Sequence, residues 1–215
     1  MRIDIGGRLA KGVLVAAMLV SLTACAVNKP FNPISSDTKF RQTSIAVIAG
    51  GTSDADVRLA DQITAGLTKR SAYHVLTQDE IAHRIPDYPV PIECKDSTKV
   101  DQKDDKVVWF QPSEKKKLNA MQARLKVDYL YVVWNSEIML VSSSQGGSTY
   151  YVYPVGNMIE FPGTKVVAST RSSNGSSTSI LALFHAKDYY IVDALNGAAD
   201  DIVDDFLDAT KSKKR

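Results

Sequence analysis

The side chain of Cys25 could take part in several kinds of chemistry. A cysteine sulfur can act as a nucleophile, bind a metal, form a disulfide or carry a lipid. Cys25 ends the stretch LTAC at residues 22–25. The second cysteine, Cys94, lies in the polar, proline-flanked stretch PIECKDS with no histidine nearby to act as its base. We therefore interpret Cys94 as an incidental free thiol and look to Cys25 for a function.

The residues before Cys25 have the pattern of a secretory leader. A basic N-terminal region is followed by the unbroken apolar run VLVAAMLV over residues 13–20, which Ser21 interrupts. A membrane-spanning helix needs about 20 apolar residues, and this run is too short for that. The pattern indicates a signal segment that is removed from the mature chain.

LTAC resembles the lipobox of bacterial lipoprotein precursors, which has an apolar residue, two small residues and a cysteine that takes a diacylglycerol. The resemblance implies a signal peptide over residues 1–24 and a mature chain that begins at an acylated Cys25, with acyl chains such as palmitate. The alternative is an ordinary signal peptide followed by a chance cysteine. Ala26, rather than aspartate, follows the cysteine. By resemblance to enterobacterial sorting, this implies an outer-membrane lipoprotein that faces the periplasm, with inner-membrane retention as the alternative.

The composition excludes a nucleic-acid-binding protein of the basic kind. The chain has 26 basic and 24 acidic residues, and the small basic excess belongs to the leader. No nucleic-acid footprint remains apart from a short basic tail at residues 211–215, which we interpret as a solvated helix end. The roughly 190 residues after the leader suit one domain.

The mature chain divides by composition into a tether and a domain. Residues 25–42 hold the lipidated cysteine and a polar, proline-containing stretch typical of a flexible tether. We expect one α/β domain over residues 43–210, with a proline-rich, charged insertion at 86–117 that is either functional or a solvated surface. The expected fold class is α/β, with a mixed sheet, an antiparallel meander and flanking helices.

Hydrophobic periodicity predicts the order of elements within that domain. The first half is predicted to contain a strand over 43–50, a helix over 53–70, a strand over 73–78 and helices over 79–85 and 113–126. The second half is predicted to contain strands over 127–141, 149–161 and 164–171, a flexible linker over 172–179 and a helix over 188–210. Ser53 is the predicted N-cap of the first helix, with Asp56 completing a capping box.

Side-chain alternation also predicts which residues share a face. Apolar residues of the strand over 127–141 are predicted to lie on one face: Leu130, Val132, Trp134, Ile138 and Leu140. A common core is predicted to contain Ile45, Val47, Leu59, Ile63, Val132, Trp134 and Phe206. The tyrosines on the predicted strands either pack across strands or line a binding surface.

The groups that an enzyme needs are not found in the sequence. Gly50 and Gly51 follow a strand and precede a helix, where backbone N–H groups can bind phosphate, but no P-loop or dinucleotide motif continues from them. A tight turn is the alternative reading of this pair. None of the three histidines lies in a metal-binding motif, and no serine has a nucleophile-elbow pattern. We therefore expect no enzyme, no catalytic residue, no metal and no cofactor.

The order of these elements resembles a known superfamily of small α/β domains. The residues that carry the resemblance are IAVIAGGTSDADVRLADQITAGLTKRSAYHVLTQDEI, at 45–81. They are similar to the domain shared by CsgG, LpoB, the N-terminal domain of TolB and PelC. The resemblance implies an accessory or scaffold lipoprotein that binds another cell-envelope protein without catalysis. The alternative that it implies is a subunit of a CsgG-like secretion ring or pore.

The predicted partners are therefore the membrane, through lipid on Cys25, and a cell-envelope protein. A homo-oligomer is also compatible with the sequence. The predicted partner-binding residues are Trp109 and Phe110 of the insertion, because an aromatic pair among exposed prolines is typical of a binding anchor.

Overall fold

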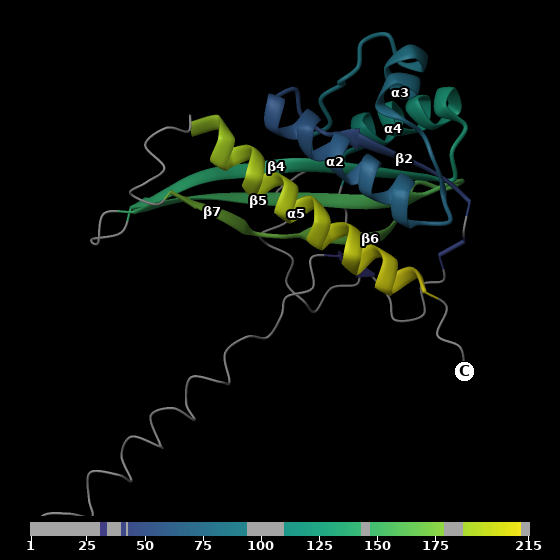
Figure 1. The fold of residues 1–215 in the computed structure, drawn as a ribbon. Coiled ribbons are helices and arrows are strands. Elements are labelled where there is room, and N and C mark those ends of the chain that lie inside the picture. The colour runs from purple at the N-terminus through teal and green to yellow at the C-terminus, as the bar shows by residue number, and fades with distance from the viewer. Residues whose placement is uncertain are drawn as a thin grey trace, which may run out of the picture.

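Helices cover both faces of a mixed sheet in this chain (Figure 1). The computed structural model describes residues 31–33, 40–41, 43–93, 110–142, 147–178 and 187–211. Within these residues the sheet has seven strands in the order β1-β6-β5-β4-β2-β3, and β7 also pairs with β5. The predicted fold class, a single α/β domain with an antiparallel meander and flanking helices, is confirmed.

The elements follow the predicted order closely. Those of the first half are β1 (Phe31–Pro33), β2 (Ser44–Ala49), α2 (Asp54–Arg70), β3 (His74–Val75), α3 (Gln78–Arg84) and α4 (Pro112–Leu125). Those of the second half are β4 (Tyr129–Ser142), β5 (Ser148–Glu160), β6 (Lys165–Arg171), β7 (Asn174–Thr178) and α5 (Lys187–Thr210). β2 runs parallel to β3 and β4, whereas β4, β5 and β6 form the antiparallel meander.

α2 begins where the sequence predicts it, at a capping box. The Ser53 side chain accepts the backbone N–H of Asp56, and the Asp56 carboxylate accepts the backbone N–H of Ser53. The same carboxylate accepts the backbone N–H of Asn135 in β4, with 2.7 Å between Oδ1 and N. Asp56 is buried, so this one side chain stabilises the helix N-terminus and connects it to the sheet.

The sheet separates two hydrophobic layers rather than enclosing one common core. Ile45, Val47, Leu59, Ile63 and Phe206 pack together on the face covered by α2 and α5. Val132 and Trp134 lie on the opposite face, under α3 and α4. The prediction of a common core was therefore wrong for those two residues. β4 is apolar on both sides because both sides are covered, and its alternation assigns neighbouring residues to different layers.

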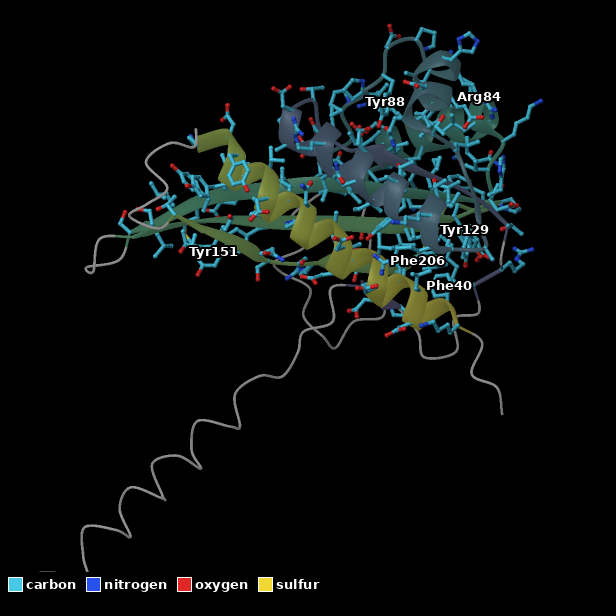
Figure 2. All side chains as sticks on the ribbon, in the orientation of Figure 1. Phe40, Arg84, Tyr88, Tyr129, Tyr151 and Phe206 are labelled. Carbon is cyan, nitrogen blue, oxygen red and sulfur yellow. The ribbon has the colours of Figure 1, made fainter. Side chains whose placement is uncertain are left out.

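The predicted tether contains a strand of the sheet. β1 pairs antiparallel with β6, with Phe31 opposite Thr170. The Phe31 ring is buried, and its centroid lies 5.1 Å from that of Phe206 and 6.0 Å from that of Tyr131. Phe40 also packs against Phe206, at a centroid distance of 6.4 Å (Figure 2). The boundary predicted at residue 43 was wrong, because burial of these rings draws the preceding segment into the domain.

The predicted linker over 172–179 contains β7. β7 pairs antiparallel with β5, from Asn174 opposite Val152 to Thr178 opposite Ser148. Gly175 is needed in this polar strand, because a Cβ there would lie 2.8 Å from Cε1 of Tyr151. The linker prediction was therefore wrong. Serine and glycine favour flexible chain when alone, but here an aromatic residue of the neighbouring strand packs over the glycine.

Beyond the end of β3, two side chains form hydrogen bonds with the backbone groups on the outer edge of β2. β3 reaches only Ile45 along this edge. Further along, Gln78 Nε2 donates to the carbonyl of Val47 at 2.8 Å, and Tyr88 Oη accepts the N–H of Ala49 at 2.9 Å. Tyr88 in turn donates to Gln78 Oε1 at 2.8 Å. These two side chains take the place of a missing strand partner.

Replacing Tyr88 by phenylalanine is expected to lower the free energy of unfolding by about 1 to 3 kcal/mol, because the N–H of Ala49 loses its acceptor.

Burial raises the pKa of Tyr88 to about 12, above the ordinary value of about 10. The neutral phenol is therefore the form that the fold favours. Its contribution is complete below about pH 10 and is lost as the pH rises toward about 12. Urea unfolding of parent and variant between about pH 8 and 12 measures both effects. A difference in stability that does not shrink as the pH rises over this range would contradict the assignment.

Candidate interaction surface

The predicted site residues fall partly outside the described residues. Cys25 and Trp109 lie outside them, and so does Cys94. Phe110 is described, and its side chain is only 2% exposed. It lies in the layer under α3 and α4, with its ring centroid 6.5 Å from that of Trp134. The prediction of Phe110 as an exposed anchor was wrong, because this apolar ring fills the core next to Trp134.

Nearby residues of the predicted insertion also belong to the core. Ile92 is buried in the same layer, and its carbonyl accepts Nε1–H of Trp134 at 3.1 Å. The Glu114 carboxylate is buried at the start of α4, where it accepts the N–H of Glu93 at 3.0 Å and pairs with Lys117. The insertion predicted at 86–117 is therefore in part a packed segment of the domain.

The space beside Gly50 and Gly51 is filled by side chains of this protein. A Cβ at Gly50 would lie 2.1 Å from the Trp134 ring, and a Cβ at Gly51 would lie 2.3 Å from Oδ2 of Asp56. A carboxylate of this protein thus occupies the N-terminus of α2, where a phosphate would bind. The tight-turn reading of the pair explains the geometry, since only glycine permits this close approach.

The aspartates of α5 contact polar and basic side chains of the protein. Arg70, at the end of α2, forms ion pairs with Asp200 and Asp204. Asp201 accepts from Asn174 Nδ2 at 3.1 Å. In the part of the chain that the structure describes, no group of three or more histidine, cysteine, aspartate or glutamate side chains is placed to hold a metal ion.

The far half of β4 carries the main exposed apolar surface among the described residues. β2 pairs with β4 only as far as Val133, whereas β4 continues to Ser142. The exposed apolar side chains lie in this extension: Ile138 (41% exposed), Met139 (37%), Leu140 (51%) and Val141 (44%). We call residues 136–142 the β4 tip edge. Figure 1 shows β4 and β5 extending beyond α2, with the first turns of α5 above them.

A bulge decides which way the side chains of the β4 tip edge point. Asn135 lies opposite Pro154, but the next ladder pair is Ile138 with Val152, so β4 has one more residue than β5 in this interval. Val152 belongs to the layer under α2 and α5. Ile138 and Leu140 therefore lie on that face, opposite to Val132 and Trp134. The prediction that all of these share one face was wrong, because a bulge shifts the alternation by one residue.

Tyrosine side chains lie beside the tip on both faces of the sheet. Leu140 is opposite Tyr150, whose ring stacks on Tyr190 of α5 at a centroid distance of 6.1 Å. Tyr189, in the same turn of α5, is 53% exposed. On the other face Met139 lies opposite Tyr151, the residue labelled at the hairpin end in Figure 2. The apolar surface of the tip thus continues on both faces of the sheet.

The outward edge of the tip has no strand partner among the described residues. Its inner edge pairs with β5 from Ile138 to Ser142, so alternate N–H and C=O groups point the other way. The β2 edge is closed by Gln78 and Tyr88, whereas no described side chain closes this one in the same manner. An unpaired edge that also carries apolar side chains is a template for another strand.

The sequence contains part of the signal for this surface. The stretch SEIMLVS at 136–142 has four apolar residues between polar ones, at the end of a strand longer than β2. Sequence reasoning predicted the strand itself but placed Ile138 and Leu140 on one face with Val132 and Trp134. Their exposure depends on where β2 and α2 end against β4, and the periodicity of β4 alone does not contain that information.

The comparisons with known proteins give structural neighbours only. No family model matches the sequence, and no curated protein matches it. A PelC dodecamer from Paraburkholderia phytofirmans is similar at 9% identity, over 78% of this chain and 95% of that chain, with a TM-score of 0.41. A lipoprotein from Neisseria meningitidis is similar at 9% identity, over 75% and 99% of the two chains, with a TM-score of 0.43.

A minor lipoprotein from Acinetobacter baumannii is also similar, at 9% identity over 77% of this chain and 90% of that one, with a TM-score of 0.41. All three TM-scores lie below 0.5. None of the helices among the described residues is long and apolar enough to span a bilayer.

Proposed function

We propose that this protein is a lipoprotein of the bacterial envelope that acts by binding a protein partner through the β4 tip edge, without catalysis. The observation that carries the proposal is the edge of residues 136–142, which has no strand partner on its outward side among the described residues and carries four exposed apolar side chains. Strand addition to such an edge supplies main-chain hydrogen bonds, and the alternating side chains supply specificity. A scaffold function needs no cofactor, and we propose none.

The anchor in this proposal is lipid on Cys25, at the outer membrane and facing the periplasm. β1 begins at Phe31, so the chain between the lipid and the sheet is short. Fully extended, the stretch from Cys25 to Phe31 spans at most about 20 Å. Lipidation would therefore hold the sheet close to the membrane surface, where a partner in the same membrane meets it at high effective concentration.

Site-specific crosslinking in native membranes tests the binding surface. A photo-crosslinking residue, benzoylphenylalanine, replaces Met139 in the tip edge, and the matched control replaces Ala65, an exposed residue on α2. The expected result is a protein adduct from position 139 and no comparable adduct from position 65. Equal labelling at both positions, or none at position 139, would contradict the proposed surface.

A further inference from the structure

A partner for the β4 tip edge must be a strand of matching length and pattern. The edge runs over residues 136–142. It begins after the last pair between β2 and β4, which is Ala49 with Val133. A partner strand of the same length extends about 24 Å at about 3.4 Å per residue. It must present apolar side chains to both faces, because Ile138 and Leu140 lie on the α5 side and Met139 and Val141 on the other.

The sequence of the tip edge meets this requirement when paired with itself. SEIMLVS is nearly symmetric about Met139, with serines at both ends and apolar residues at the centre. In an antiparallel pair centred on Met139, Ile138 lies opposite Leu140 of the partner's strand on the α5 face. At both ends of the paired segment, Ser136 lies opposite Ser142 of the partner's strand. Each apolar residue of this face thus meets an apolar residue, and each serine meets a serine.

The side chains of the other face are compatible with the same register. Met139 lies opposite its own copy, and Glu137 lies opposite Val141 at the margin of the pair, where a carboxylate still reaches water. Registers centred one residue away fit less well. Centring on Leu140 places Ile138 opposite Ser142, and centring on Ile138 places Met139 opposite Glu137. The side-chain pattern therefore favours the register centred on Met139, because of the three registers only this one pairs Ile138 with Leu140 on the α5 face.

The geometry of the sheet permits this pairing. A two-fold axis perpendicular to the sheet joins two antiparallel strands edge to edge and leaves the α5 helices of both copies on the same side. Ladder pairs then extend from Ser136 to Ser142, so the paired segment stops short of β2. Such an interface is closed: it uses the open edge of both copies and leaves neither tip free to recruit a third chain.

We propose that the partner strand at the β4 tip edge is the same segment of a second copy of this protein, paired antiparallel about Met139. This inference rests on the proposed function, because it names the partner of the same edge. The two copies form one continuous sheet, and the apolar rows on its α5 face lie between the two α5 helices.

Disulfide trapping in the full-length, membrane-bound protein tests the register. In a Cys94→Ser background, Met139→Cys places two thiols in directly opposite positions, with Cα atoms about 4.5 to 5.5 Å apart, a separation that a disulfide spans. The matched control is Ser142→Cys, which in this register lies about 20 Å from its own copy. Mild oxidation is expected to give at least about tenfold more disulfide-linked dimer from Met139→Cys than from Ser142→Cys. The background protein without either cysteine should give none.

A mixed pair checks the register a second time. Ile138→Cys and Leu140→Cys, carried on differently tagged copies in one cell, lie opposite each other and should link. Each alone should link poorly, because its own copy lies two residues away along the ladder. Equal dimer from the Met139 and Ser142 variants, or mixed linking no greater than that of each variant alone, would overturn the inference.

The outcomes also separate this inference from the proposed function. If benzoylphenylalanine at position 139 captures a different protein and Met139→Cys gives no dimer, the second-copy inference fails while the binding surface stands. If neither probe reacts, both fail. If Met139→Cys dimerises and the photo-adduct is a dimer of this chain, both hold.

Discussion

Replacing Phe31 by alanine is expected to lower the free energy of unfolding by about 3 to 5 kcal/mol. The Phe31 ring is only 1% exposed. It makes edge-to-face contacts with Phe206 and Tyr131, which join β1 to α5 and to the centre of the sheet. Alanine would leave a cavity between these rings and remove the aromatic contacts. Against a typical domain stability of about 5 to 15 kcal/mol, this is a large fraction.

Urea unfolding followed by circular dichroism measures the loss, and Tyr189→Ala is the matched control. Tyr189 is also aromatic and belongs to α5, but it is 53% exposed, so its replacement should cost about 1 kcal/mol or less. If Phe31→Ala unfolded like the parent, the segment before residue 43 would be a tether outside the domain, and the assignment of β1 to the sheet would be wrong.

Replacing Cys25 by serine is expected to release the protein from the membrane. Each buried CH₂ of an acyl chain contributes about 0.8 kcal/mol, and stable anchoring requires more than one chain or a second signal. Loss of the acylated sulfur should therefore move most of the protein to the soluble fraction.

Membrane fractionation of cells that express each variant measures this release. Cys94→Ser is the control, because it removes the other thiol of the chain and should leave the protein in the membrane fraction. Recovery of Cys25→Ser in the membrane at the level of the parent would contradict the anchor.

Local sequence patterns predicted most of the elements because their signals are local. The Ser53 and Asp56 capping box marks the start of α2 within one residue, and the lengths of β4 and β5 follow from long alternating runs. Apolar stripes on α2 and α5 correctly placed Leu59, Ile63 and Phe206 in one layer. In each case the pattern depends on residues a few positions apart.

The elements that were missed depend on residues far apart in the sequence. β1 has three residues, one of them Pro33, and forms because β6 offers an edge and Phe206 offers a ring. β7 is polar, and its Gly175 is explained by Tyr151 in another strand. The bulge after Asn135 turned Ile138 and Leu140 to the other face. Strand pairing of this kind depends on context more than on propensity.

The sequence reasoning placed the candidate site in a different element from the one proposed on the structure. Sequence reasoning predicted a binding protein without catalytic groups and proposed Trp109 and Phe110 as its surface. Phe110 is buried, and the exposed apolar residues belong to β4 instead. An aromatic residue within a charged stretch has no local feature that distinguishes a surface anchor from a core residue, since burial is decided by whether another element covers it.

The mass of the N-terminal peptide tests the central claim most directly, which is that this domain works at a membrane through a lipid on Cys25. The peptide is taken from protein purified from native membranes. The account predicts a peptide that begins at Cys25, lacks residues 1–24 and carries a diacylglycerol modification on the sulfur. A peptide with unmodified Cys25, or a mature chain that begins at another residue, would contradict it.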